Sequence, residues 1–395
     1  MSADGQRGLE ARVCMLVHHR FPRDVRVRRQ ARALLAAGAG VRVIALRAPG
    51  EPARERWQGI EVRRLPVRRH RGAPIPVYLA EYAAFASMAA LRLAAGGPFD
   101  VIHVHAPPDW LLLAALAGRA RGARLVLDIH DLSPELYAER FGDAGGALAR
   151  TALLGSERLA CALADRVLTV TRAFARVLAS RGVPQGKIGV LHNCPDEEIF
   201  SPEGGEERRG RRGELRIVHC GTLVRRYGAD VLLDAFGRLA LERSGVRLDI
   251  YGEGDHTGQL ARRIREAPLA GRVFLHGDVP QEQVARALAR ADLCAVPNRS
   301  SAFTDLLLPT KLLEALRMGC PVVASDTPVL REMAAEGARL VPPGDADGLY
   351  RAMRELCDDA GARARLRRAG LRVARRFAWA EEKQNLLELY REIVG

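Results

Sequence analysis

Residues 308–328 read LPTKLLEALRMGCPVVASDTP and change from a helical pattern to a strand pattern at Gly319. Pro309 stands where a helix would begin, and Gly319 stands where it would end. The apolar run that follows is typical of a buried strand. This stretch therefore predicts a helix over Lys311–Arg317 and a strand over Pro321–Ala324, which together form one unit of a parallel α/β sheet.

The same stretch can bind an anion. The first turn of a helix has free backbone N–H groups and the positive end of the helix dipole, which favour a phosphate. Lys311 would add a positive charge at this point, and the Glu314 carboxylate could accept both hydroxyls of a ribose. The alternative is that Lys311 and Glu314 form an ordinary solvated helix face.

Short apolar runs alternate with amphipathic stretches along the rest of the chain, a pattern typical of doubly wound α/β domains. In the first half, strands are expected at Val13–Val17, Val41–Leu46, Val101–Val104, Leu125–Ile129, Val167–Val170 and Ile188–Leu191. In the second half they are expected at Arg216–Cys220, Leu248–Tyr251, Val273–Leu275, Leu293–Val296, Pro321–Ala324 and Ala338–Val341. In such sheets, ligands bind at the carboxyl ends of the strands, near the switch in strand order.

The alternation breaks at residues 201–214, which are polar, charged and rich in glycine. This break predicts a linker between two domains, residues 1–200 and 201–375. A final amphipathic helix is expected over Trp379–Val394.

Composition excludes several classes of protein. A chain of 395 residues with 48% hydrophobic and 27% charged residues is globular. It contains no apolar run of membrane-spanning length and no apolar core of a signal peptide near its start. The seven cysteines form no C-x-x-C pair, so we expect reduced, buried cysteines in a cytoplasmic protein.

The net charge of +14 is unevenly distributed. Residues 1–200 contain 29 basic and 19 acidic residues, against 32 and 28 in residues 201–395. Arg20–Arg32 and Arg54–Arg71 contribute 13 of the 29. Arginine-rich codon usage is one explanation for this imbalance. An anionic membrane surface, a lipid-diphosphate acceptor or nucleic acid would each provide a physical one.

Residues 309–323 resemble the P-x-K-x-x-E-x-x-x-x-G-x-P-V-V motif of retaining glycosyltransferases of family 4. Those enzymes have the GT-B fold, in which two Rossmann-like domains face each other across a cleft. The resemblance implies that Glu314 holds the nucleotide ribose and that Lys311 lies near the diphosphate, with Pro309 and Thr310 at the start of the helix. The commoner form of the motif has an additional Glu where this chain has Leu306.

Two glycine-containing loops extend the resemblance. Residues 219–228, HCGTLVRRYG, resemble the family's loop at the pyrophosphate, where an Arg/Lys pair neutralises the leaving group. This chain has Thr222 and Tyr227 at those two positions, so the resemblance transfers the cationic role to Arg225 or Arg226. Two arginines at a strand-to-helix turn suit a diphosphate, although such a loop is also commonly just exposed. The donor-binding residues expected from both loops are Gly221, Thr222, Arg225, Arg226, Gly252 and Gly254.

The first half carries further matching segments, namely Phe99–His105, Asp128–Glu135 and the P-R-D-x-R-V sequence that begins at Pro22. They imply that His105 is the active-site histidine near the donor sugar. The acceptor-side residues implied are Arg23, Asp24, Arg26, His130 and Asp131. Residues 376–395 are expected to return to the first domain, as the last helix does in the family.

His103 and His105 lie on one face of a strand and could ligate a metal ion. No third ligand with suitable spacing follows nearby, so no metal site is expected. The one Asp-x-Asp pair, Asp345 and Asp347, is better suited to capping a helix than to holding a metal.

These observations predict a metal-independent enzyme without a bound cofactor that transfers a sugar with retention of configuration. The expected donor is a nucleotide sugar, in the first place a UDP-sugar, and the acceptor is a hydroxyl of a saccharide, a small molecule or a lipid-linked molecule. Such enzymes serve surface polysaccharide, glycolipid or glycoconjugate synthesis. Arg226, Lys311 and His105 are the expected catalytic residues, since catalysis would depend on positioning and on cations around the departing diphosphate.

Three alternative functions are also compatible with the sequence. A nucleotide-sugar epimerase or a phosphorylase would share the fold but not the reaction. A nucleic-acid-binding protein would explain the charge, but aromatic residues are only 5% and no recognition motif is visible, so no nucleic-acid partner is expected. The expected location is the cytoplasm, with peripheral attachment to the inner face of the membrane as a further hypothesis.

Overall fold

The computed structural model describes residues 8–70, 73–142, 146–201 and 214–395, and the chain forms two compact units. Unit 1 contains the chain up to His192 together with Ala380–Gly395. Unit 2 is Asn193–Trp379. Most of the predicted linker, residues 202–213, lies outside the described residues.

Within the described residues, unit 1 is built on an eight-stranded sheet with the order β3-β4-β2-β1-β5-β6-β7-β8. Neighbouring strands are parallel except for β3 and β4, which form an antiparallel hairpin at the edge. The strands are β1 (Arg12–Arg20), β2 (Gly40–Leu46), β3 (Arg54–Trp57), β4 (Ile60–Leu65), β5 (Val101–Ala106), β6 (Arg124–Ile129), β7 (Arg166–Thr169) and β8 (Ile188–Val190). Strand order reverses between β1 and β5, which marks the carboxyl ends of these two strands as the ligand-binding edge.

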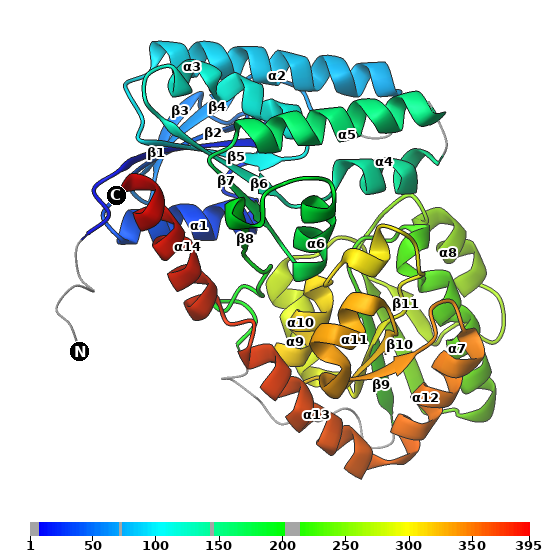
Figure 1. Ribbon diagram of the computed structural model, residues 1–395. Helices are drawn as coiled ribbons and strands as arrows, with labels where there is room; N and C mark the ends of the chain where they lie inside the picture. The colour runs from blue at the N-terminus through cyan, green and yellow to red at the C-terminus, as the bar shows by residue number, and fades with distance from the viewer. Residues whose placement is uncertain (1–7, 71–72, 143–145, 202–213) are drawn as a thin grey trace, which may run out of the picture. The chain divides into compact units, whose positions relative to one another are not determined.

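Helices cover both faces of this sheet, as parallel strands require because both of their faces are apolar. Figure 1 shows α2, α3 and α5 on one face, and α1 and α14 on the other. The helices of unit 1 are α1 (Val25–Ala36), α2 (Ile75–Ala95), α3 (Leu116–Arg119), α4 (Ser133–Phe141), α5 (Gly146–Leu163), α6 (Arg172–Ser180) and α14 (Trp379–Val394), with 3-10 turns η2 (Asp109–Ala115) and η3 (Gln185–Lys187).

The described part of unit 2 has a six-stranded, fully parallel sheet with the order β11-β10-β9-β12-β13-β14. Its strands are β9 (Leu215–Cys220), β10 (Val246–Tyr251), β11 (Val273–Leu275), β12 (Leu293–Val296), β13 (Val322–Ser325) and β14 (Ala338–Val341). This is the 3-2-1-4-5-6 order of the Rossmann fold, and its switch point lies between β9 and β12.

The helices of unit 2 pack on both faces of its sheet (Figure 1). Phe236 on α7 and Met353 on α12 are fully buried against strand residues such as Ile217 and Leu248. The helices are α7 (Ala229–Glu242), α8 (Thr257–Ile264), α9 (Gln281–Arg290), α10 (Thr310–Arg317), α11 (Pro328–Ala334), α12 (Ala346–Asp358) and α13 (Ala360–Arg375), with 3-10 turns η4 (Arg225–Tyr227), η5 (Thr304–Leu306) and η6 (Ala335–Gly337).

The predicted fold class of two α/β domains with parallel sheets is confirmed, but the unit boundary lies earlier than residue 200. Phe200 is buried, and its carbonyl oxygen accepts a hydrogen bond of 2.8 Å from Arg317 Nε. Glu197 pairs with the same arginine at 3.1 Å. These contacts hold residues 193–200 on unit 2. The chain rejoins unit 1 at Ala380 and not at residue 376.

Two other expectations can be compared with the structure. The hairpin β3–β4 was not predicted, because β3 begins with three charged residues and β4 contains three more, within a segment that was interpreted only as basic. All seven cysteines are buried thiols that form no disulfide, as expected. In the described part of the chain, no helix combines the length and apolarity that crossing a membrane requires.

A substitution at Gly228 tests the packing of the turn between β9 and α7. This glycine has a left-handed φ of 68°, and an added Cβ would overlap the carbonyl oxygen of Pro297. We expect Gly228→Ala to lower the free energy of unfolding by about 2–3 kcal/mol. Denaturant unfolding measures this change. Gly258→Ala on α8 is the control, because its Cβ would meet nothing within 4 Å. Equal stability of the two variants would contradict the assigned turn.

Candidate active site

In unit 2, the loops that follow β9 and β10 approach each other at backbone distance. The Gly221 N–H donates to the Tyr251 carbonyl at 3.0 Å, and the Leu223 N–H donates to the Glu253 carbonyl at 3.0 Å. A Cβ at Gly252 or Gly254 would overlap the backbone of residues 221 and 223. The predicted glycines thus lie together because no side chain fits between these loops.

Lys311 extends from the first turn of α10 to this pair of loops. The side chain is only 8% exposed, and a Cβ built at Gly221 would lie 3.3 Å from Lys311 Cδ. Its Nζ lies 4.4 Å from the centre of the Tyr227 ring and has no hydrogen-bond partner among the described residues. Burial lowers the pKa of Lys311 to about 8, against the opposing effect of nearby groups that include Glu314.

Arg226 contacts the same aromatic ring. Its guanidinium carbon lies 5.0 Å from the centre of the Tyr227 ring and 5.8 Å from that of Phe303. The buried Nε forms no hydrogen bond within the described residues. Two cations thus flank Tyr227, and a buried cation without an acceptor is suited to an anionic ligand.

The remaining donor-side candidates occupy the same edge of the sheet but differ in exposure. Three of them, Thr222, Arg225 and Thr310, are exposed. Pro309 is the half-buried N-cap of α10, and Glu314 is half-buried one turn further along that helix. The structure therefore brings Gly221, Arg226, Lys311 and Tyr227 together. Arg225 lies outside this contact set, so Arg226 is the better placed of the two arginines.

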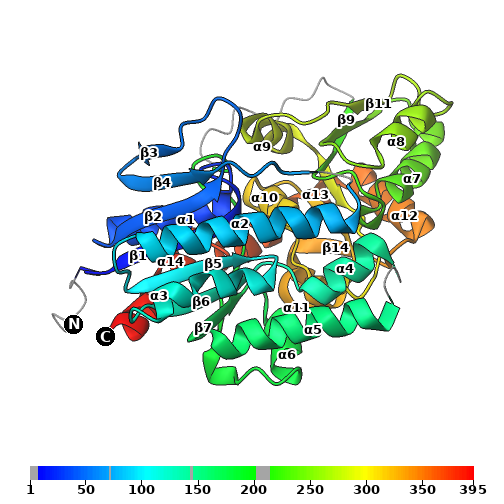
Figure 2. The ribbon, with the colours of Figure 1, turned by 90° about the horizontal axis from the view of Figure 1, so that it is seen from above.

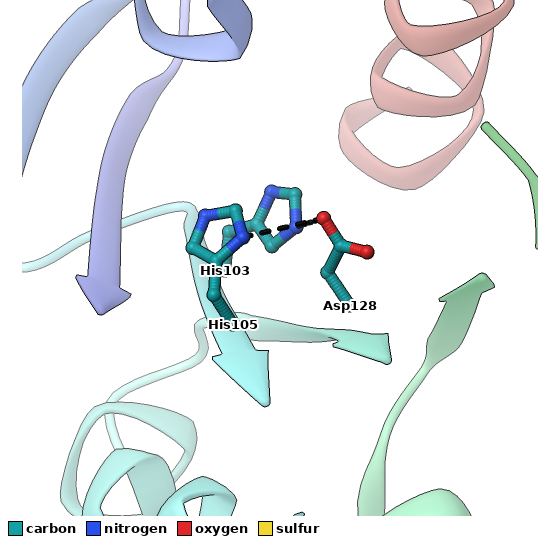
Figure 3. Close-up of side chains that lie close together, drawn as sticks. All are labelled: His103, His105 and Asp128. Atoms are coloured by element: carbon teal, nitrogen blue, oxygen red, sulfur yellow. Dashed lines mark ion pairs between the residues drawn. The ribbon is translucent and has the colours of Figure 1, made fainter. Parts of the chain in front are cut away.

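In unit 1, polar side chains meet where β5 and β6 end. His105 lies directly opposite Asp128 in the strand register, and Asp128 Oδ2 lies 3.2 Å from His105 Nδ1 and 3.5 Å from His103 Nε2 (Figure 3). His130 Nε2 lies 3.3 Å from the same oxygen, which also accepts a 3.0 Å hydrogen bond from Gln30 Nε2. We call these five residues the Asp128 cluster.

The Asp128 cluster is buried, and burial sets its protonation. Burial lowers the pKa of His103 to about 4 and that of His130 to about 3. Burial would raise the pKa of Asp128, but neighbouring His130 and hydrogen bonds from His103 and His105 outweigh it and hold this pKa well below its usual range. At neutral pH the Asp128 carboxylate is therefore ionised, and the imidazoles of His103 and His130 are neutral.

The expectation that His103 and His105 lack a third metal ligand was wrong. Ligand atoms of His103, His105 and Asp128 lie within 4.8 Å of one another. Asp128 was not recognised because it comes from the neighbouring strand, not from nearby sequence. Two of these three residues also have other hydrogen-bonding partners, however. Asp128 accepts from Gln30, and His103 Nδ1 lies 2.8 Å from the hydroxyl of Tyr390 on α14.

The first loop of unit 1 contributes a helix cap. Asp24 caps α1 by accepting from the N–H groups of Arg26 and Val27 at 3.1 and 3.3 Å. Burial would raise the pKa of Asp24, but Arg26 and the histidines at 130 and 105 outweigh it, so the pKa is lowered. Asp24, Arg26, His105 and His130 are thus near enough to interact electrostatically.

The two other acceptor-side candidates, Arg23 and Asp131, differ in exposure, and Asp345 caps a helix. Arg23 is exposed and Asp131 is half-buried. Asp345 caps α12 by accepting from the Gly348 N–H at 2.8 Å, as the capping alternative to a metal site predicted. Sequence reasoning missed Gln30 and Tyr390, which join the site only through the register of the sheet and the return of α14.

Comparison with known proteins identifies the family of this chain. Residues 24–194 match the family described as "Glycosyl transferase 4-like domain", and residues 214–359 match "Glycosyl transferases group 1". These two matches cover most of both units. The chain therefore belongs to the group 1 glycosyltransferases, and it is a glycosyltransferase with the GT-B fold.

Individual relatives span most of the chain. It is 28% identical to D-inositol 3-phosphate glycosyltransferase 1 of Catenulispora acidiphila, over 87% of this chain and 83% of that one. Among solved structures, sucrose-phosphate synthase from Thermosynechococcus elongatus has a TM-score of 0.79 at 22% identity, over 97% and 99% of the two chains. Anabaena HepE in complex with UDP-glucose has a TM-score of 0.73 at 18% identity, over 97% and 100%.

Proposed function

We propose that this enzyme transfers a sugar from a UDP-sugar to a hydroxyl acceptor with retention of configuration, without a metal ion or bound cofactor. The observation that carries the proposal is the pair of cations, buried Lys311 and half-buried Arg226, around Tyr227 at the glycine loops of unit 2. The structural similarity to HepE, solved with UDP-glucose, supports the choice of donor.

In this proposal, unit 2 holds the nucleotide. The diphosphate lies against the backbone at Gly221 and receives charge from Lys311, Arg226 and the first turn of α10. Glu314 accepts the ribose hydroxyls. Negative charge grows on the diphosphate as the bond to the sugar breaks, so fixed cations stabilise the transition state more than the ground state.

Unit 1 would provide the acceptor side and the groups around the sugar. Ionised Asp128 orients the rings of His105 and His130, because an imidazole that donates to a carboxylate is held in one tautomer. His105 is then available to bind a sugar hydroxyl, and Asp24, Arg23, Arg26 and Asp131 line the acceptor side. A saccharide or a lipid-linked molecule of surface polysaccharide or glycolipid synthesis is the proposed acceptor.

Slow hydrolysis of the donor tests the reaction without knowledge of the acceptor. Incubation with UDP-, GDP- and dTDP-sugars should release free sugar fastest from a UDP-sugar, with the donor's anomeric configuration in the first product seen by NMR. Preference for a GDP-sugar would refute the donor, and the opposite anomer would refute retention. A donor converted to its epimer would indicate the epimerase instead.

The same assay tests metal independence. We expect EDTA to leave the hydrolysis rate unchanged. Loss of activity that Mn²⁺ restores would show a required metal, and His103, His105 and Asp128 would be the first ligands to substitute.

Glu314→Ala tests the ribose assignment. Loss of two hydrogen bonds to a carboxylate should weaken UDP binding about 10- to 100-fold, measured by calorimetry. Glu355→Ala is the matched control, since Glu355 is an exposed acid on α12 whose recorded partner is Arg339. Unchanged affinity of the Glu314 variant would remove Glu314 from the site.

The lowered pKa of Lys311, about 8, predicts proton uptake on nucleotide binding. Only the protonated amine attracts a diphosphate, so a bound diphosphate raises this pKa. UDP binding should therefore take up about half a proton at pH 8, where the terminal phosphate of UDP is already ionised, and affinity should fall above pH 8. Calorimetry in HEPES and Tris, which differ in ionisation enthalpy, measures the uptake. Lys311→Met should abolish it, and identical heats for the wild type in both buffers would disprove the assignment.

A further inference from the structure

Exposed large apolar side chains are concentrated on one part of unit 1. Of the nine such residues in the described chain, seven lie on α2, η2, α3 and α5. Apart from Val77 they are Leu79, Leu91, Leu113, Leu116, Leu148 and Leu159. Scattered exposed leucines are ordinary, but a concentration on neighbouring elements marks an interaction surface.

These elements are neighbours in space. Both α2 and α5 pack on η2. The two helices run in a similar direction on the same face of the sheet, and Figure 2 shows α3 between them (Figures 1 and 2). We call the exposed side of α2, η2, α3 and α5 the leucine surface.

The helices bury only narrow stripes. In the 21 residues of α2, the buried side chains are Glu81, Phe85, Ala89 and Leu93, which follow one another at intervals of four. The opposite side is mainly alanine and leucine, including Leu91 at 70% exposed. On α5, Leu148 and Leu159 lie opposite buried Glu157, and Leu148 is 81% exposed.

The acidic residues on these elements are buried, whereas the basic residues are exposed. Their acidic residues, Glu81, Asp109 and Glu157, are all buried. Their exposed charged residues are all arginines, namely Arg92, Arg119, Arg150 and Arg158. The leucine surface thus presents apolar side chains and positive charge, with no exposed carboxylate on its own elements.

We propose that the leucine surface docks this enzyme on an anionic lipid bilayer. Leucines would enter the boundary between headgroups and acyl chains, while arginines pair with lipid phosphates. A second copy of the chain fits less well, because two such surfaces would bring like charges together. This inference does not depend on the proposed donor or on retention.

The location differs from the basic segments that the sequence singled out. In Arg54–Arg71, Arg64 is buried between Glu51 and Glu55 at 3.3 and 2.6 Å. In Arg20–Arg32, Arg29 is buried. Those segments therefore expose less charge than their arginine count suggests.

Sedimentation of the full chain with vesicles tests the proposal. At low salt the protein should sediment with vesicles of equal phosphatidylglycerol and phosphatidylcholine, and not with phosphatidylcholine alone. The double variant Leu91→Gln/Leu148→Gln should bind the anionic vesicles at least about tenfold more weakly. Leu241→Gln on α7 of unit 2 is the matched control, since Leu241 is 74% exposed but lies outside the leucine surface, and it should bind as the wild type does.

Several outcomes would overturn the proposal. These are no binding by the wild type, equal binding by the double variant, or an equal loss in the Leu241 variant. A wild-type dimer in light scattering that the double variant converts to monomers would instead assign the surface to self-association. Far-UV circular dichroism and Tm confirm that each variant is folded.

Discussion

The backbone contact between the loops after β9 and β10 is the constraint on which the candidate donor site depends. Hydrogen bonds from residues 221 and 223 to residues 251 and 253 extend the sheet pairing beyond the ends of the strands. This extension places Gly221 against Lys311 and leaves no room for side chains at Gly252 and Gly254. An ammonium group held in such a place loses hydration, which explains both its lowered pKa and its need for an anion.

A different interaction organises unit 1. Asp128 accepts a hydrogen bond from Gln30 on α1 and lies 3.2 and 3.3 Å from His105 on β5 and His130 after β6, and His103 connects it to Tyr390 on α14. One buried carboxylate therefore joins the amino-terminal and carboxyl-terminal segments of unit 1 to the histidines at the strand ends. Removing this charge would leave several buried polar groups without partners, which costs far more than the loss of one surface ion pair.

Sequence alone predicts the repeated features of this molecule well. Apolar runs such as Val101–Val104 and Leu293–Val296 lie in buried strands, because burial on both faces of a parallel sheet leaves a continuous apolar pattern. The predicted helix over Lys311–Arg317 is also present. In β3 the side chains of Arg54 and Arg56 are exposed, so this strand shows no such run. Asp128 and Gln30 are 98 residues apart, and only strand order and register bring them together. A pattern read along the chain holds no information on such contacts.

The net charge shows the same limit of prediction from sequence. The count of arginines in residues 1–200 is a property of composition, whereas the potential of a surface depends on where the carboxylates go. Glu81 turns inward to His18 and His70 at 3.1 and 2.9 Å, and Glu157 turns inward to Arg181 at 2.8 Å. Each of these contacts turns a carboxylate away from the outer side of α2 or α5. The arginines that remain outside lack exposed acidic neighbours on their own helices, so an apolar surface acquires a single sign of charge.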